Sequence, residues 1–466
     1  MDVDTVLEKS VLRLVSGGGW RAVLVFVALA ASAAVLLASF PTSTSAPAWF
    51  SIYSSSSISS ASARPPVTTP AAVEPSGGVK VAPLWAYGVA IQTDLQLLDA
   101  KEEIARAPPL PNDSDLHAPL SYELMEKILK VYVYKEGEKP LCHTPELTGI
   151  YASEGWFMKH SRQLRTHLYV PDSHSMQPLS IFLRDYVNLI AAKFPFWNRT
   201  KGSDHFLVAC HDWVPRFLPL IKRRGITFPM IFRLLLLLQG TYTTKLHEEL
   251  RRNAIKVVCN ADVSEGIFLR GKDVALPETY VKTPKDLHKD VGGRPVSRRN
   301  IFAFFAGQMH GRVRPVLVQQ WKGKDSDMKI YEKLPAAVAR RMSYVEHMKS
   351  SRFCICPMGY EVNSPRIVEA IHYECVPVII ADNFVLPFEE LLDWTAFSVV
   401  VPEKDIPNLK KILKGISERR YKRMQSNVKK LQRHFLWNSE PVKYDLFHMI
   451  LHSVWFNRLN QMNTKA

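Results

Sequence analysis

The sequence predicts an α/β protein in which two domains, each built on a parallel sheet, face each other across a cleft. Over residues 301–401, short apolar runs alternate with segments of helical spacing, which is typical of parallel strands joined by crossover helices. Another apolar run, at 206–210, is followed by polar residues and predicts a strand of a separate first sheet. The 466 residues are enough for both domains after an anchor and a stem.

The N-terminus predicts a single membrane anchor. Residues 22–40 form an uncharged run rich in Ala, Val and Leu, which at ~1.5 Å per residue just matches the ~30 Å core of a bilayer. Lys9, Arg13 and Arg21 precede this run, so residues 1–21 are expected in the cytosol and the remainder in the lumen. A cleaved signal peptide is the alternative, but the run ends in a poor cleavage site.

The segment after the anchor is expected to be a stem. Residues 41–119 are rich in Ser, Pro, Ala and Thr, a composition that does not support a packed core. Sequons at Asn112 and Asn198 predict N-glycosylation, which requires a luminal location. The remainder divides into an N-terminal domain over 120–300 and a C-terminal domain over 301–466.

The net charge and the cysteine content limit the kinds of ligand and metal site that the protein is expected to have. The formal net charge of +16 suits anionic ligands, but no nucleic-acid-binding motif accompanies it, so no nucleic-acid partner is expected. The six cysteines can form disulfides in an oxidising lumen, with a pairing that the sequence leaves open. Cys354 and Cys356 are separated by one residue in an apolar run, a spacing that argues against a zinc site.

The expected elements follow from apolar periodicity and from Gly and Pro positions. In the N-terminal domain we expect strands at 130–134 and 206–210. The strands expected in the C-terminal domain lie at 301–306, 328–331, 353–356, 377–380 and 397–401. The helices expected between and after them lie at 316–321, 336–348, 365–374, 388–392, within 406–435, and at 444–456. The last two helical regions close the chain and are expected to pack back against the first domain.

The polar loop and helix after the strand at 353–356 predict a ligand site, because parallel sheets bind ligands at the carboxyl ends of their strands. Ser364 is a suitable N-cap and Pro365 suits the first helical position. Arg366 and Glu369 then share one face near the helix N-terminus, where an Arg suits a diphosphate and a Glu suits ribose hydroxyls. The alternative is a solvated Arg–Glu pair, which any helix can carry.

The turn after the strand at 301–306 is a second part of this site. Gly307 and Gly311 allow a close approach of backbone, and Arg312 and Arg314 are placed to meet phosphates. The alternative is an ordinary loop with solvated arginines, since this glycine spacing is not diagnostic. After the strand at 377–380, Asp382 and Asn383 are candidates for contacts with a donor sugar.

Five segments together resemble the exostosin family, glycosyltransferase family 47, in the form found in plant cell-wall enzymes. The resemblance extends over most of residues 129–458. The segments that carry it are PFWNRTKGSDHFLVACHDW (195–213), CNADVSEGIFLRGKDVALPETYV (259–281), FFAGQMHGRVRP (304–315), FCICPMGYEVNSPRIVEAIHYECVPVII (353–380) and HFLWNSEPVKYDLFHMILHSVWFNR (434–458). Several long motifs in one order are more specific than a single glycine-rich loop.

The resemblance implies a fold and an activity. It implies the GT-B architecture, in which two Rossmann-like domains face a cleft, and a type II Golgi membrane protein with a luminal catalytic part. The implied reaction is transfer of a sugar, with inversion, from a UDP-sugar to a cell-wall polysaccharide or a glycoprotein glycan. Other glycosyltransferases are implied as partners. In relatives, the positions that match Arg366 and Glu369 lie at the nucleotide sugar, which favours a ligand site over the solvated pair.

The N-terminal domain is expected to present the acceptor. His211 and Asp212 follow the strand at 206–210, and either group could take the proton of the acceptor hydroxyl. A structural alternative is equally open, in which Asp212 caps a helix or pairs with His211.

No metal or other cofactor is expected, because positive side chains can stabilise a departing diphosphate. Asp325 and Asp327 resemble the metal-binding Asp-x-Asp of another glycosyltransferase class. They precede a strand rather than end one and lie in a Lys-rich turn, so we do not assign them a metal.

Two stretches depart from the family pattern. Residues 155–178 are shorter than the matching stretch of family members, and residues 216–242 match nothing in the pattern. We interpret 216–242 as retained intron sequence or an error in the gene model, with a membrane-contacting loop as the alternative. This altered first domain leaves a second function open, namely a catalytically inactive glycan-binding or scaffold subunit of a glycan synthase complex.

Overall fold

The computed structural model describes seven stretches of the chain. They are residues 84–107, 119–132, 134, 146–163, 176–210, 247–266 and 268–462. The chain divides into two compact units, 1–76 and 77–466, and every described residue belongs to the second. The predicted cytosolic tail at 1–21, the anchor at 22–40 and the atypical stretch at 216–242 lie outside the described residues. Among the helices that are described, none combines the length and the apolar character needed to cross a membrane.

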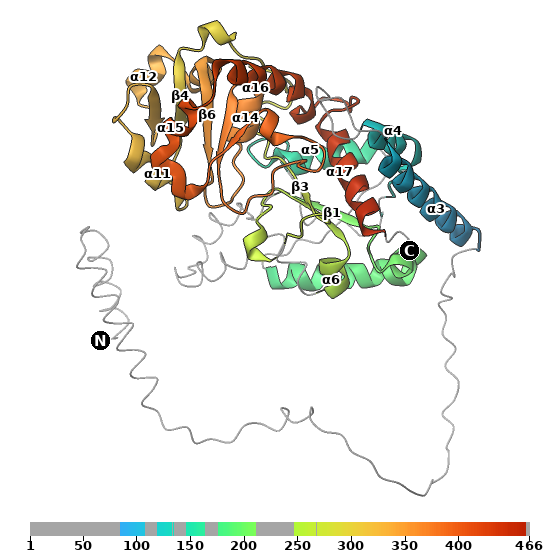
Figure 1. Ribbon diagram of the computed structural model, residues 1–466. Helices are drawn as coiled ribbons and strands as arrows, with labels where there is room; N and C mark the ends of the chain where they lie inside the picture. Colours follow the sequence, from blue (N-terminus) through green and yellow to red (C-terminus); the bar gives the residue numbers. More distant parts are fainter. Residues whose placement is uncertain are drawn as a thin grey trace, which may run out of the picture. The chain divides into compact units, whose positions relative to one another are not determined.

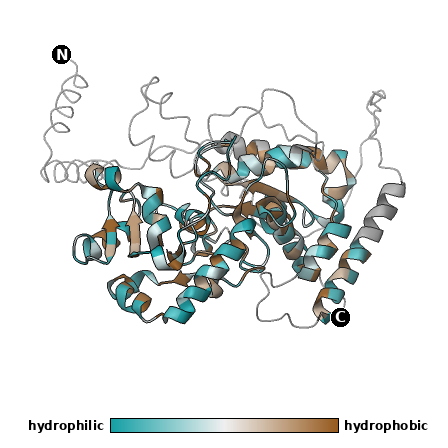
Figure 2. Cartoon of the chain, turned by 90° about the horizontal axis from the view of Figure 1, so that it is seen from above, coloured by the Kyte–Doolittle hydropathy of each residue, from teal (hydrophilic) through white to brown (hydrophobic). Residues whose placement is uncertain are grey.

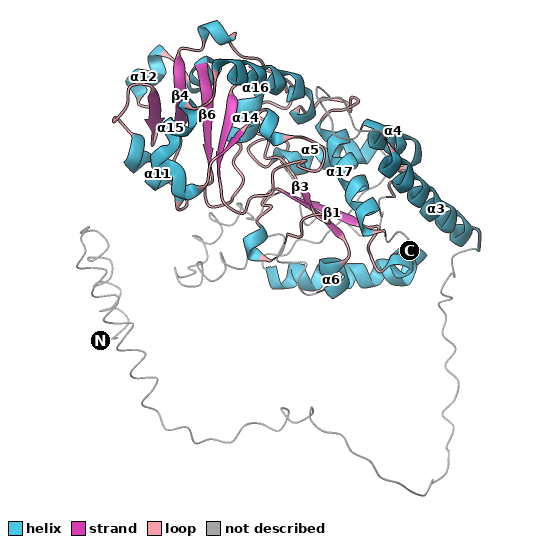
Figure 3. Cartoon of the chain, viewed as in Figure 1, coloured by secondary structure: helices cyan, strands magenta, loops and turns pink. Residues whose placement is uncertain are grey.

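The larger sheet has five strands, all parallel, in the order β5-β4-β6-β7-β8 (Figures 1 and 3). The strands are β4 Ile301–Ala306, β5 Met328–Tyr331, β6 Ser351–Pro357, β7 Val376–Ile380 and β8 Val399–Val400. Phe304 of β4 pairs with Cys354 of β6, which pairs in turn with Pro377 of β7. All five strands expected in this half are confirmed. The central strands β6 and β7 are short apolar runs buried on both faces, whereas the edge strands β5 and β8 are only partly buried.

Hydrophobic side chains make this sheet the centre of the core. Figure 2 shows the strands as hydrophobic, with hydrophilic stretches on the helices around them. Phe304, Phe305, Ile355 and Val378 are each almost fully buried. Burial of one such side chain stabilises the fold by roughly 1.5–3 kcal/mol.

The helices between these strands differ from the prediction in their bounds. They are α11 Val313–Trp321, α12 Ala336–Arg341, α13 Tyr344–Ser350 and α14 Arg366–His372. The helix predicted at 336–348 is split, because Ser343 accepts a hydrogen bond from the backbone of Glu346 and begins a new helix. The structure describes residues 388–392, and they do not form the predicted helix, because Phe388 has a positive φ of 59°.

The last of the closing segments, the helix α17, returns to the first sheet, as predicted. The closing segments are the 3₁₀ helix η6 Glu403–Asn408, the helices α15 Leu409–Lys414 and α16 Glu418–Leu431, the 3₁₀ helix η7 Gln432–Phe435 and the helix α17 Leu446–Gln461. Helix α17 contacts two strands of the first sheet, β2 and β3. Asn457 of α17 donates a hydrogen bond to the carbonyl of Asp273 at 3.0 Å. The chain end is therefore part of the first half.

The first sheet has three parallel strands in the order β1-β2-β3. They are β1 Phe206–Ala209, β2 Ile255–Val258 and β3 Val274–Ala275, and the helices of this half are α5 Ala152–Gln163, α6 Met176–Lys193, α7 Pro195–Thr200 and α10 Glu248–Arg252. The strand predicted at 206–210 is confirmed. The strand predicted at 130–134 is wrong for the described residues 130–132 and 134, which have no strand pairing. Tyr132 and Tyr134 instead belong to an aromatic cluster with Phe194 and Phe196.

The structure differs from the predicted stem over 41–119. Leu84–Arg106 forms the helix α3, which packs on α4 Pro119–Ile128 and on α17. Leu97, Ala100 and Ile104 lie at helical spacing and contact a separate core cluster that includes Trp455. The prediction used the average composition of residues 41–119, which is rich in Ser and Pro, and therefore missed this amphipathic helix.

Two disulfides join the described cysteines. Cys210–Cys259 links the carboxyl ends of β1 and β2, and Cys354–Cys375 links β6 to the start of β7. Cys356 is a free, buried thiol. Both bridges therefore connect neighbouring parallel strands. Cys210–Cys259 lies at the carboxyl ends of its strands, whereas Cys354–Cys375 reaches the amino end of β7.

Removing the Cys354–Cys375 bridge should lower the free energy of unfolding by about 3 kcal/mol, from the entropy of a 21-residue loop in the unfolded chain. The test is urea unfolding of Cys354→Ala/Cys375→Ala, followed by tryptophan fluorescence. Cys356→Ala is the matched control and should cost at most ~1 kcal/mol. Equal losses in the two variants would contradict the prediction.

Candidate functional site

The site lies where the strand order of the larger sheet reverses. From β4 the chain moves to β5 on one side, and from β6 it moves to β7 on the other. The connections after β4 and β6 therefore lead to opposite sides of the sheet, and in doubly wound sheets this is the position of the crevice that binds ligands. The loop after β4 spans residues 307–312 and the loop after β6 spans 358–365, and the predicted Arg314 lies in the first turn of α11.

The two loops cross at a contact between glycines. Gly311 has a positive φ of 68°, and a Cβ there would lie 1.7 Å from the carbonyl oxygen of Gly359. A Cβ at Gly359 would lie 2.8 Å from Nη2 of Arg314. Only residues without side chains allow this crossing. The contact fixes the relative position of the loops, as the predicted close approach at Gly311 requires.

Arg366 begins α14 and points back toward the loop after β4. Its Nε and Nη2 donate to the carbonyl of Ala306, at 3.3 and 3.0 Å. Its guanidinium carbon lies 5.4 Å from the ring centroid of Phe305, within the range of a cation–π contact. A Cβ at Gly307 would lie 2.4 Å from Nη2 of Arg366. Glycine at 307 thus makes room for the guanidinium.

Arg314 lies beside Arg366 and is nearly buried. Its Nη1 donates to the carbonyl of Gln308 at 3.3 Å, and its buried Nε has no hydrogen-bond partner within the described chain. Burial and the positive charge of Arg366 lower the pKa of Arg314 to about 10. Backbone carbonyls accept hydrogen bonds from both guanidinium groups. The charges of Glu278 and Glu369 act on Arg314 and Arg366 respectively, and an anionic ligand would neutralise the two guanidinium groups further.

Glu369 lies one turn along α14 and is partly buried. Its Oε2 accepts a hydrogen bond from the hydroxyl of Tyr344 at 2.9 Å. Burial raises the pKa of Glu369, and the charge of Arg366 and the bond from Tyr344 oppose that rise.

The predicted helix start is wrong by one residue. Pro365 is the N-cap and Arg366 is the first helical residue of α14. Ser364 does not cap the helix; its Oγ is buried and has no hydrogen-bond partner among the described residues. The helix has seven residues and ends before Glu374, whose φ is 55°. The positive charge of the site therefore comes from the guanidinium groups rather than from the helix.

Three other predicted residues belong to a separate surface network. Arg312 donates through Nε and Nη2 to Glu403, at 2.8 and 2.6 Å. Oδ1 of Asp382 accepts from the backbone N–H of Glu403, and the carbonyl of Asn383, whose φ is 65°, accepts from Val263. A carboxylate already neutralises Arg312. The structure brings together Gly307, Arg314, Arg366 and Glu369, and it places Arg312, Asp382 and Asn383 in this neighbouring network.

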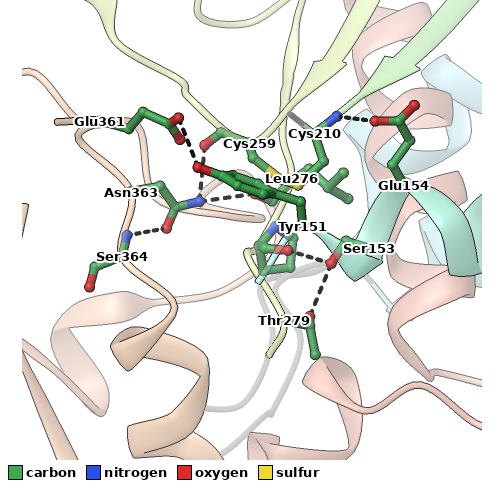
Figure 4. The surroundings of a disulfide bond; sticks show 11 residues. Tyr151, Ser153, Glu154, Cys210, Cys259, Leu276, Thr279, Glu361, Asn363 and Ser364 are labelled. Carbon is green, nitrogen blue, oxygen red and sulfur yellow. Dashed lines mark hydrogen bonds between the residues drawn. A yellow bond between two sulfur atoms is a disulfide. The ribbon is translucent and has the colours of Figure 1, made fainter. Parts of the chain in front are cut away.

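The loop after β6 is also bound to the first sheet (Figure 4). The side-chain amide of Asn363 donates to the carbonyls of Cys259 and Leu276, at 2.9 and 3.2 Å. The backbone N–H of Val362 donates to Oδ1 of Asn260 at 3.2 Å. These bonds place the predicted crevice at the junction with the carboxyl ends of β2 and β3.

A pair of carboxyl groups at this junction was not predicted. Glu361 accepts from the hydroxyl of Tyr151 at 3.0 Å and contacts Glu278, which is almost fully buried. Burial raises the pKa of Glu361. Glu278 and Glu361 lie far apart in the sequence. The one feature that could have pointed to them is that each belongs to a segment carrying the family resemblance, 259–281 or 353–380.

The predicted base residues His211 and Asp212 lie outside the described residues, as does the sequon at Asn112. The preceding residue is held firmly, since the backbone N–H of Cys210 donates to Glu154 at 3.0 Å (Figure 4). Asn198 is exposed on α7, and its side-chain amide donates to the carbonyl of Ala191. Glycosylation at Asn198 stays a prediction.

The Asp-x-Asp segment is engaged by a lysine. Lys410 forms ion pairs with Asp325 and Asp327. Both aspartates precede β5 and so lie at the opposite edge of the sheet from the crevice. The described residues contain no cluster of His, Cys, Asp and Glu suited to a metal.

Comparison with known proteins gives the following matches. Residues 125–416 match the family model of the exostosin GT47 domain. "Probable glycosyltransferase At5g03795" of Arabidopsis thaliana is 42% identical over 363 residues, which are 73% of this chain and 64% of that protein. "Probable glycosyltransferase At5g25310" of the same plant is 40% identical over 73% of this chain and 70% of its own length. "Probable beta-1,4-xylosyltransferase IRX10L", also from Arabidopsis thaliana, is 30% identical over 58% of this chain and 62% of its own length.

Gly311→Ala should destabilise the protein more than Gly323→Ala. Both glycines have a φ of 68°, but a Cβ at Gly323 would meet no atom within 4 Å. Gly323→Ala should therefore cost only the left-handed strain of about 1–2 kcal/mol. Gly311→Ala should cost roughly 1–3 kcal/mol more, because the backbone of Gly359 must move.

Urea unfolding of the two glycine variants measures the difference. The same loss of unfolding free energy in both would show that the crossing of the loops tolerates a side chain, contrary to this prediction.

Proposed function

Since the chain belongs to the exostosin family of glycosyltransferases, GT47, we propose that it transfers a sugar, with inversion, from a UDP-sugar to a cell-wall polysaccharide or a glycoprotein glycan. One observation carries this proposal. Two guanidinium groups, of Arg314 and Arg366, lie side by side at the switch point of a parallel sheet and are held by backbone carbonyls. A diphosphate is the ligand that such a pair fits.

In this proposal each group has one role. Arg366 and Arg314 neutralise the diphosphate, and Glu369 accepts hydrogen bonds from the ribose. As the acceptor oxygen bonds to the anomeric carbon, the bond from that carbon to the diphosphate oxygen breaks. The two arginines stabilise the negative charge that grows on the departing oxygen. The acceptor proton passes to a base, for which Asp212 and His211 are our candidates.

The setting follows from the same family membership. We propose a single-pass Golgi membrane protein of type II, with its catalytic part in the lumen, where other glycosyltransferases are partners. The names of the relatives guide the choice of donors, because some are named as probable xylosyltransferases and others as probable glucuronosyltransferases. UDP-xylose and UDP-glucuronic acid therefore head the panel of UDP-sugars to be tried with the purified chain.

The second candidate function is an inactive glycan-binding or scaffold subunit of a synthase complex. The departures from the family pattern at 155–178 and 216–242 favour it. The panel separates the two candidates, because a scaffold subunit would neither hydrolyse nor transfer any UDP-sugar.

Arg366→Ala should lower turnover by roughly 10²- to 10³-fold, because the variant loses charge stabilisation that is largest in the transition state. Arg366→Lys should recover only part of the rate, since an ammonium does not reproduce the planar fork. Glu369→Ala should chiefly raise the donor KM, because its ribose contact is the same before and during reaction. Initial rates over a range of donor concentrations give all three values.

Arg340→Ala is the matched control for the loss of an arginine, since Arg340 is exposed at the end of α12. Near-normal turnover in Arg366→Ala, with an unchanged circular dichroism spectrum, would move the donor site away from α14.

Transfer should not require a divalent metal, because the arginine pair supplies the positive charge. A chelator should leave initial rates unchanged at saturating donor. A complete loss of activity that Mn²⁺ restores would contradict this expectation and would direct attention to Asp325 and Asp327.

A further inference from the structure

An exposed aromatic stack joins the loops after β4 and β6, next to Arg314 and Arg366. His310 comes from the loop after β4 and Tyr360 from the loop after β6, and their ring centroids are 4.7 Å apart with an interplanar angle of 20°. Tyr360 is 71% exposed, the highest value among the large hydrophobic side chains of the described residues. One face of the tyrosine ring packs on the imidazole.

The residues on both sides of Tyr360 in the sequence are held in place. On one side, Gly359 is in contact with Gly311 at the crossing of the loops. On the other side, the carboxylate of Glu361 accepts the hydrogen bond from Tyr151 (Figure 4). An exposed side chain normally loses conformational freedom when it binds a partner. Here the stack and its anchored neighbours have already restricted the ring, so that cost is small.

The stack lies next to the arginine pair and carries little charge itself. Burial, and then the charges of Arg314 and Arg366, lower the pKa of His310. The imidazole is therefore neutral at neutral pH. A flat, uncharged aromatic surface thus lies beside the group that is proposed to bind the diphosphate.

We propose that Tyr360, supported by His310, is the platform on which a pyranose ring of the acceptor glycan binds. The C–H groups on one face of a pyranose pack against the electron-rich face of an aromatic ring, while its hydroxyls remain in water. This inference rests on the proposed function and names the group that receives the acceptor.

The position of the ring favours an acceptor over the nucleotide of the donor. Small ligands are usually enclosed, with 70–90% or more of their surface buried, and the partly buried Glu369 with Tyr344 offers such surroundings for the ribose. A polymer larger than the site must extend from the crevice into solvent. A ring that is both exposed and adjacent to the arginines suits the part of that polymer at the rim. Single exposed tyrosines need no explanation, but this one is stacked, anchored and next to the crevice.

Calorimetric titration of the purified full-length chain with xylohexaose, cellohexaose and mannohexaose, and separately with UDP, tests the proposal. Tyr360→Ala should raise the dissociation constant for the hexasaccharide that binds by roughly tenfold, and its affinity for UDP should be unchanged. Tyr360→Trp and His310→Phe keep the platform and should keep the affinity. Tyr132→Ala is the matched control, since Tyr132 is also an exposed tyrosine but belongs to the cluster with Phe194 and Phe196.

Three results would overturn the proposal. If Tyr360→Ala bound the hexasaccharide as tightly as the unmodified chain, Tyr360 would not be the platform. If the variant lost affinity for UDP as well as for the hexasaccharide, the ring would instead contact the nucleotide. Binding of UDP but of none of the three hexasaccharides by the unmodified chain would also reject it, while leaving the proposed donor site intact. Failure of the unmodified chain to bind UDP would instead count against the proposed function.

Discussion

The arrangement of the site depends on one buried side chain, Asn363. Its amide donates to the carbonyls of Cys259 and Leu276, which follow β2 and β3, and its carbonyl oxygen accepts from the backbone of Ser364. Carbonyls at strand ends lie beyond the ladder and need donors when buried. Asn363 satisfies two of them and at the same time ties the loop after β6 to the first sheet. The crossing at Gly311 and the start of α14 both depend on the position of that loop.

Electrostatics distinguish the two arginines of the proposed donor site from Arg312. Arg312 meets both oxygens of Glu403 and has no excess charge to offer. Arg314 and Arg366 contact carbonyl dipoles, which orient a guanidinium without neutralising it. Their mutual repulsion is tolerated because loop crossings and the Phe305 ring hold them in place. The positive potential is therefore a consequence of packing, and an incoming dianion would relieve the repulsion.

Much of the larger sheet could be predicted, because each strand is a short apolar run between Gly, Pro or polar residues. Details of the site were less accessible. Arg366 and Glu369 were found from helical spacing and family resemblance, whereas the engagement of Arg312 by Glu403 depends on a residue far along the chain. The Glu278–Glu361 contact and the His310–Tyr360 stack were not predicted, since no local pattern pairs residues from different loops. Helix α3 was missed because composition was averaged over a segment that also holds an unrelated Ser- and Pro-rich part.

The sequence by itself determined the parallel α/β organisation, the loops that carry the site and the family of the protein, since these depend on local periodicity and on motifs that keep their order. Only the tertiary structure decided which charged groups face each other. Ion pairing falls off over a few ångströms, so the neutralisation of Arg312 and Asp325 and the buried charge of Arg314 depend on distances between loops. The tertiary structure also paired the cysteines, because only folding brings Cys210 to Cys259 and Cys354 to Cys375.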